Sequence, residues 1–148
     1  MKVRDILTRD PEVIHPDATI MEAAQKMKQL DIGMLPVCDG DRLKGMLTDR
    51  DIAIRAVAEG RDPNTCKVSD TMTPRVIYCY EDQKLQEVAE LMEERQIRRL
   101  PVLNHEKRLV GILSLGDLVV RSGKEKLAGE VLERVCEPMH SEAIAPVF

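Results

Sequence analysis

The chain has 148 residues, of which 43% are apolar and 32% charged, a balance that indicates a globular protein rather than a disordered one. Its net charge of -4 and its shortage of aromatic residues (Tyr78, Tyr80 and Phe148) argue against a nucleic-acid partner, which would need a basic surface and stacking rings. No stretch approaches the roughly 20 apolar residues of a membrane-spanning helix, so we expect a cytoplasmic protein with no membrane partner.

The first half of the chain reads as five elements in the order β-α-β-β-α. A capping box formed by Thr19 and Glu22 precedes apolar residues at helical spacing, which predicts a helix that extends to about Leu30. Alternating or continuous apolar runs predict the strands, and Gly60 is expected to end the second helix. The remaining elements are a short apolar stretch at Val13-Ile14, strands at Met34 to Cys38 and Leu43 to Leu47, and a helix from Asp49 to Glu59.

The second half repeats this order. Asp82 is expected to cap a helix whose buried stripe is Leu85, Val88, Ala89 and Met92. Proline in the second strand of each copy, at Pro36 and Pro101, favours a strand edge or a strand start. The other elements are a short stretch at Val76-Ile77, strands around Pro101 and at Leu109 to Leu113, and a helix at Leu115 to Arg121.

A third region follows the two copies. Leu127, Val131, Leu132 and Val135 share one face of a predicted helix from Lys124 to Val135, which should dock on the body or on a partner chain. From Glu137 onward, prolines and polar residues indicate a loosely held end. We therefore expect a first repeat at 1–62, a second repeat at 63–122, and a C-terminal helix and tail at 123–148.

Direct comparison of the halves supports an internal duplication. Three segments recur at a nearly constant displacement, while Val13-Ile14 is matched to Val76-Ile77. The recurring segments are Val3 to Thr8 with Val68 to Thr73 and Ile32 to Val37 with Ile97 to Val102, both displaced by 65, and Gly45 to Asp51 with Gly111 to Asp117, displaced by 66. One unit of about 60 residues would be marginally stable alone, so we expect an α+β (α/β) fold in which two β-α-β-β-α units pack on each other.

The candidate site is the motif in which a glycine is followed three residues later by Thr or Ser and six residues later by Asp. It contains Thr48 and Asp51 in the first copy and Ser114 and Asp117 in the second, each where a strand gives way to a helix. A hydroxyl three residues before an acid is typical of a helix cap. The same groups can also bind phosphate or sugar oxygens, and a carboxylate can accept both hydroxyls of a ribose.

Together with Leu-Pro-Val in both copies, this motif resembles the cystathionine-β-synthase (CBS) domain pair, often called a Bateman module, over roughly Val3 to Arg121. The resemblance implies that the two units are packed through their sheets and leave two clefts between them, which take AMP, ADP, ATP or S-adenosylmethionine. It implies that Asp51 and Asp117 hold ribose hydroxyls and that Thr48 and Ser114 assist at sugar or phosphate.

The resemblance also implies adenine and phosphate contacts. Ile14 and Ile77, with backbone near Pro36 and Pro101, would hold the adenine. Arg98 and Arg99 precede Leu-Pro-Val in the second copy, where basic residues of the family often meet phosphate. The first copy has Gly33 and Met34 at that place, so the two clefts need not be equally occupied.

Three functions remain open from sequence. The first is a stand-alone, non-catalytic regulatory module that works as a homodimer or through an unidentified target protein. The second is a stress-response interaction protein with empty clefts or a metal or redox site, although the cysteines and histidines lack zinc spacing and no metal ligand is assigned. The third is a nucleotide hydrolase, which no Ser-His-Asp, H-E-x-x-H or Walker pattern supports, and we expect no enzyme and no covalent cofactor.

Overall fold

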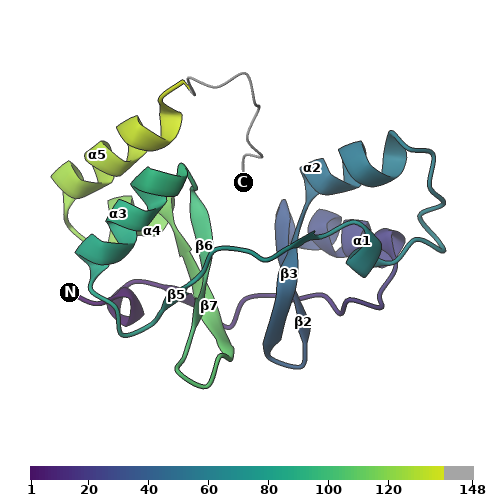
Figure 1. The fold of residues 1–148 in the computed structure, drawn as a ribbon, viewed down its shortest axis with the longest axis horizontal. Coiled ribbons are helices and arrows are strands. Elements are labelled where there is room, and N and C mark those ends of the chain that lie inside the picture. The colour runs from purple at the N-terminus through teal and green to yellow at the C-terminus, as the bar shows by residue number, and fades with distance from the viewer. Residues whose placement is uncertain (139–148) are drawn as a thin grey trace. The chain divides into compact units, whose positions relative to one another are not determined.

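The structure is a computed structural model that describes residues 1–138 (Figure 1). Within these residues it contains five α-helices and two β-sheets, which confirms the predicted mixed α and β class with a C-terminal helix. The expected loosely held end falls mostly on residues 139–148, which lie outside the described residues.

The chain forms two compact units that do not follow the order of the sequence. Unit 1 contains Met1–Asp10, Ile77–Glu106 and the described residues from Val110 onward, and unit 2 contains Pro11–Val76 and Lys107–Leu109. The expected boundaries at residues 62 and 122 divide the chain by repeat, whereas these units divide it by packing. The start of the first repeat therefore packs with the second, and the start of the second packs with the first.

Unit 2 has a three-stranded sheet in the order β2-β3-β4, with β2 (Met34–Asp39) and β3 (Arg42–Thr48) paired antiparallel. Strand β4 (Thr73–Pro74), from the start of the second repeat, extends the sheet, with Gly45 opposite Pro74 and Met46 opposite Thr73. The other elements are α1 (Ile20–Leu30), α2 (Asp49–Asp51) with the π-helix Ile52–Val57 directly after it, and the 3-10 helix Val68–Asp70.

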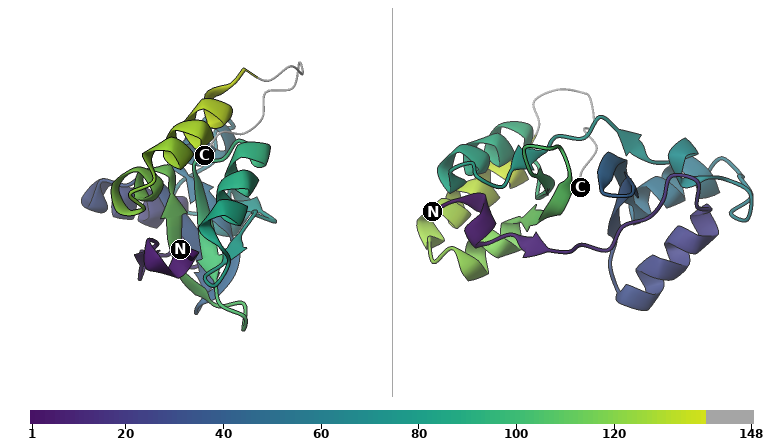
Figure 2. Two further views of the ribbon diagram at one scale, coloured as in Figure 1. Left: turned by 90° about the vertical axis from the view of Figure 1, so that its left-hand side faces the viewer. Right: turned by 90° about the horizontal axis from the view of Figure 1, so that it is seen from below.

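Unit 1 has a four-stranded sheet in the order β1-β7-β6-β5. Strand β1 (Thr8–Arg9), from the start of the chain, pairs with β7 so that Thr8 lies opposite Ile112 and Arg9 opposite Gly111. Figure 2 shows α5 running beside α3. The elements besides β1 are the 3-10 helix Val3–Asp5, β5 (Cys79–Tyr80), α3 (Leu85–Arg95), β6 (Arg99–Leu103), β7 (Leu109–Ser114), α4 (Leu115–Arg121) and α5 (Glu125–Cys136).

The two predicted caps of the first helices have different outcomes. The Thr19 hydroxyl accepts a hydrogen bond from the amide of Glu22 at 3.2 Å, which confirms the start of α1. The prediction for Asp82 is wrong, because α3 begins after Lys84 without a side-chain cap. The Asp82 carboxylate instead hydrogen-bonds the His105 ring at 2.5 Å, and this bond is the main cause that lowers the pKa of Asp82.

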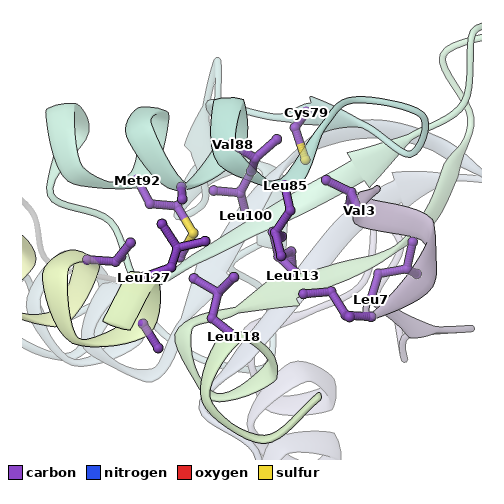
Figure 3. Close-up of a cluster of buried hydrophobic side chains, with 14 of the residues drawn as sticks. Val3, Leu7, Cys79, Leu85, Val88, Met92, Leu100, Leu113, Leu118 and Leu127 are labelled. Atoms are coloured by element: carbon purple, nitrogen blue, oxygen red, sulfur yellow. The ribbon is translucent and has the colours of Figure 1, made fainter. Parts of the chain in front are cut away.

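The core of unit 1 includes side chains from the start of the chain. Figure 3 shows Val3 and Leu7 beside Leu85 and Leu113, and all four are 5% exposed or less. Helix α5 docks on α3 and α4, so of the two expected placements, on the body or on a partner chain, the structure shows the first. Leu132 was expected on its buried face but is 47% exposed, and Ala128 is buried instead.

Strand register corrects two further expectations. The expected strand at Val76-Ile77 is absent, and β5 lies three residues later, with Cys79 opposite Val102 in a parallel pair. Pro36 is in β2, at the edge of its sheet, but Pro101 is in β6, which lies inside its sheet. Proline is tolerated there because the pairing with β5 begins at Val102, beyond the residue that lacks an N–H.

None of the helices formed by residues 1–138 has the length and apolar composition needed to cross a bilayer.

Candidate functional site

In unit 2 the motif residues form a reciprocal cap at the start of α2. The Thr48 amide donates to Asp51 Oδ2 and the Asp51 amide donates to Thr48 Oγ1, both at 3.0 Å. Both residues are less than 10% exposed, so the carboxylate is held rigidly in a mostly dry environment. Its second oxygen, Oδ1, lies 3.8 Å from Arg55 Nε. The cap therefore uses one carboxylate oxygen and directs the other away from the helix backbone.

Unit 1 repeats this geometry at the start of α4. The Ser114 amide donates to Asp117 Oδ2 at 2.9 Å, and the Asp117 amide donates to Ser114 Oγ at 3.1 Å. Asp117 is 8% exposed, and its Oδ1 lies 3.7 Å from Arg121 Nε. One contact has no counterpart in unit 2: the Thr8 hydroxyl donates to Asp117 Oδ1 at 3.3 Å.

The two arginines that face these carboxylates also hold the exchanged chain segments. Arg55 Nη1 donates to the carbonyl of Met72 at 3.2 Å, and Arg121 Nη1 donates to the carbonyl of Leu7 at the same distance. Met72 and Leu7 occupy equivalent positions in the two copies, displaced by 65. Each arginine thus joins a candidate ligand-binding carboxylate to the segment contributed by the other repeat.

The apolar residues expected at adenine differ between the copies. Ile14 is buried, its amide donates to the Pro36 carbonyl at 3.0 Å, and it lies opposite Val37 in a parallel bridge. In unit 1 the residue opposite the equivalent Val102 is Cys79. Cys79, not Ile77, is therefore the structural counterpart of Ile14, and the constant displacement of 65 in the sequence was the signal for it.

Ile77 is half-buried and packs against the core of unit 1, while Pro101 is buried in β6. The basic residues before it are both exposed. The Arg98 carbonyl accepts from the Leu115 amide at 2.8 Å, which puts its backbone at the start of α4. Its guanidinium donates to Cys136 Sγ at 3.7 Å, and Arg99 is the first residue of β6.

Each unit thus brings together its own hydroxyl, carboxylate and helix start, and the structure adds residues that sequence reasoning missed. These are Arg55 and Arg121, which face the carboxylates, and Thr8, which bonds one of them. Their repetition was visible in the sequence: the arginines are displaced by 66, and Thr8 recurs as Thr73. The motif alone did not show that segments so distant in sequence would meet it.

The cysteines were the basis of the metal or redox alternative. Cys38, Cys66 and Cys79 are buried and Cys136 is exposed, and all four are free. Residues 1–138 contain no group of three His, Cys, Asp or Glu side chains that could hold a metal ion. Burial raises the pKa of Cys79 to about 12, and burial together with the Asp41 charge raises the pKa of Cys38 to about 11.

We therefore expect only Cys136 to react quickly with a thiol reagent in the folded protein. A thiol with a pKa near 12 is about a thousandfold less ionised at pH 8 than one at 9.0, and burial also blocks the reagent. The measurement is a colorimetric thiol titration of native protein at pH 8, with urea-unfolded protein, in which all four thiols react, as control. Rapid reaction of two or more thiols without unfolding would contradict this expectation.

Comparison with known proteins gives a consistent family match. The sequence matches the CBS domain over residues 3–57 and 68–123. CBS domain-containing protein YhcV of Bacillus subtilis is 42% identical over 133 residues, which are 90% of this chain and 94% of that protein. Hypoxic response protein 1 of Mycobacterium tuberculosis is 41% identical over 137 residues, which are 92% of this chain and 94% of that protein.

Two solved structures are similar in fold as well as sequence. A crystal structure of Hypoxic Response Protein I with two coordinated zinc ions has a TM-score of 0.73 and 42% identity, and the match covers 80% of this chain and 97% of that one. The CBS domain pair of protein MJ0100, in complex with 5'-methylthioadenosine and S-adenosyl-L-methionine, has a TM-score of 0.70 and 34% identity, covering 83% of this chain and 96% of that one.

Proposed function

This chain belongs to the CBS domain family and carries the domain twice, and from that premise we propose that it is a non-catalytic regulatory module that binds an adenosine-containing ligand through Asp51 and Asp117. The observation that carries the proposal is the repeated cap, in which each buried carboxylate uses Oδ2 for the helix and keeps Oδ1 away from the helix backbone. A ribose presents two neighbouring hydroxyls, which a carboxylate can accept. The MJ0100 pair binds ligands that contain this group, which supports the assignment.

AMP, ADP, ATP and S-adenosylmethionine share the ribose and differ in what is attached to it. Thr48 and Ser114 already accept bonds through their hydroxyl oxygens, so their hydroxyl protons are available to a sugar or phosphate oxygen. Arg98 and Arg99 are exposed cations beside the unit 1 motif and suit a phosphate. Such a ligand would act as a signal only through unequal affinity for two conformations or two oligomeric states of the protein.

Native mass spectrometry of protein purified without added nucleotide tests this function. We expect retained mass corresponding to an adenosine-containing compound, or its uptake when AMP, ATP or S-adenosylmethionine is added. The same spectra report zinc, which a metal site in the alternative stress-response protein could hold and which a 42% identical structure contains. If none of these three compounds binds in the spectra or by titration calorimetry, the proposal is wrong.

We further propose that the protein self-associates as a homodimer. Ile54 of unit 2 and Val120 of unit 1 occupy equivalent positions, and they are 48% and 80% exposed. Each is one residue before an arginine that faces the candidate carboxylate. Apolar side chains exposed at the same place in both units are typical of a surface that meets another protein.

The free thiols fit a reducing compartment, and we propose that the protein is cytoplasmic.

Replacing Val120 by lysine is expected to shift the protein from dimer to monomer. A charge at the centre of an apolar interface loses its hydration, and the loss opposes association. Sedimentation velocity at several protein concentrations measures the shift, with Leu30→Lys on helix α1 as the control for an exposed leucine elsewhere. A wild-type protein that is already monomeric, or a Val120→Lys variant with unchanged self-association, would contradict this interface.

A further inference from the structure

Two equivalent threonines differ in what their hydroxyls contact. Thr8 and Thr73 are displaced by 65, and each begins a short strand that completes the sheet of the other repeat's unit. The Thr8 hydroxyl donates to Asp117 Oδ1 at 3.3 Å. Within residues 1–138, the Thr73 hydroxyl is buried and has no hydrogen-bond partner. The two positions therefore differ in what their hydroxyl groups contact and not in residue type.

The backbone places both threonines alike. Thr8 lies opposite Ile112, and Thr73 lies opposite Met46, which is the equivalent residue one copy earlier. In each unit the carbonyl of this threonine also lies against the motif glycine. Thr73 thus occupies in unit 2 the backbone position that Thr8 occupies in unit 1. Its hydroxyl, however, makes no hydrogen bond to Asp51.

Counting acceptor positions shows the consequence for a ligand. A carboxylate offers about four lone-pair positions. Asp51 uses one on the Thr48 amide, and one faces Arg55, so two remain for the two hydroxyls of a ribose. Asp117 uses one on the Ser114 amide and one faces Arg121, and Thr8 takes a third. Only one position then remains at Asp117.

We propose that Thr8 weakens binding at Asp117: a ligand with two neighbouring hydroxyls binds there only by displacing the Thr8 hydroxyl, whereas Asp51 needs no such displacement. This inference rests on the proposed function, because it assumes that both carboxylates hold a ribose. It adds that one of the two sites has a competitor for the ligand and names the residue that supplies it. Thr8 is a positioning residue here, since it acts on the carboxylate and not on the ligand.

The test is titration calorimetry of the full chain with AMP, comparing wild type with Thr8→Val. Valine keeps the shape of threonine and removes the competing donor. We expect the Asp117 binding step, which is the step that Asp117→Ala removes, to tighten by about tenfold to a hundredfold, the equivalent of one hydrogen bond to a charged group, while the Asp51 step is unchanged. Thr8→Ser keeps the hydroxyl and should behave as wild type. Thr73→Val, the matched control in the other unit, should leave the Asp117 step unchanged.

A second ligand distinguishes the proposed competition by the Thr8 hydroxyl from a structural disturbance at β1. 2'-Deoxy-AMP has one hydroxyl fewer and needs only the position that Asp117 already offers, so Thr8→Val should not improve its binding. Equal gains for AMP and 2'-deoxy-AMP would overturn the inference, as would an Asp117 step that Thr8→Val leaves unchanged or loosens. Failure of the proposed function looks different: neither wild type nor any variant would bind AMP, ATP or S-adenosylmethionine at all.

Discussion

Replacing Asp51 by alanine is expected to weaken binding of an adenosine-containing ligand at the unit 2 site by about a hundredfold or more. Hydrogen bonds to a charged group contribute about 1.5 to 3 kcal/mol each, and alanine removes the acceptor for both ribose hydroxyls. The same change in unit 1, Asp117→Ala, should abolish the other step of binding. Titration calorimetry with AMP and with S-adenosylmethionine measures both effects.

The loss of the helix cap must be separated from the loss of ligand contacts. Asp51 also accepts the Thr48 amide, so its alanine variant should lose about 0.5 to 2 kcal/mol of stability. Thr19→Ala is a matched control, because it removes a side-chain cap from α1 in the same unit, outside the candidate site. We expect Thr19→Ala to lower the unfolding midpoint in urea by a similar amount and to leave ligand affinity unchanged. Unchanged affinity in both aspartate variants would remove the ribose role.

Local patterns in the sequence predicted most helices and strands correctly. The stripe of Leu85, Val88, Ala89 and Met92 is buried as expected, and α4 spans Leu115–Arg121 as expected. The reciprocal caps at Thr48 and Ser114 also follow the sequence pattern, since a hydroxyl and an acid three residues apart need only their own backbone to interact. Both partners of such a contact lie within one helical turn of each other, which is why a local sequence pattern can predict it.

The errors concern contacts that join distant segments. Asp82 has the chemistry of a cap, but His105, 23 residues away, hydrogen-bonds its carboxylate. Ile77 has the same side chain as Ile14, but Cys79 is the residue that pairs with the neighbouring strand as Ile14 does. Thr8 meets Asp117 across 109 residues, and nothing near either residue in sequence indicates this bond. The candidate site could therefore be chosen from the motif, while the partners of its carboxylates could not be predicted.

The glycine of the motif has a structural role that the exchanged strands explain. A Cβ atom at Gly111 would lie 2.1 Å from Leu7 Cδ1 and 2.5 Å from the Thr8 carbonyl oxygen. At Gly45 it would lie 2.6 Å from the carbonyl oxygen of Thr73, the equivalent residue. All three distances are far below a van der Waals contact. The motif therefore begins with glycine because a strand from the other repeat passes directly over it.

Replacing Gly111 by alanine is accordingly expected to cost about 3 kcal/mol or more of folding free energy, at the upper end for overpacking, because a backbone carbonyl must move. For a chain of this size that lowers Tm by roughly 6 to 12 °C. Gly129→Ala on α5 is the matched control: its Cβ would meet nothing within 4 Å, and alanine should raise stability by about 0.5 to 1 kcal/mol through helix propensity. Urea unfolding followed by circular dichroism measures both variants. If Gly111→Ala proved as stable as wild type, β1 could not lie against β7 as the structure has it, and the Thr8 contact with Asp117 would lose its basis.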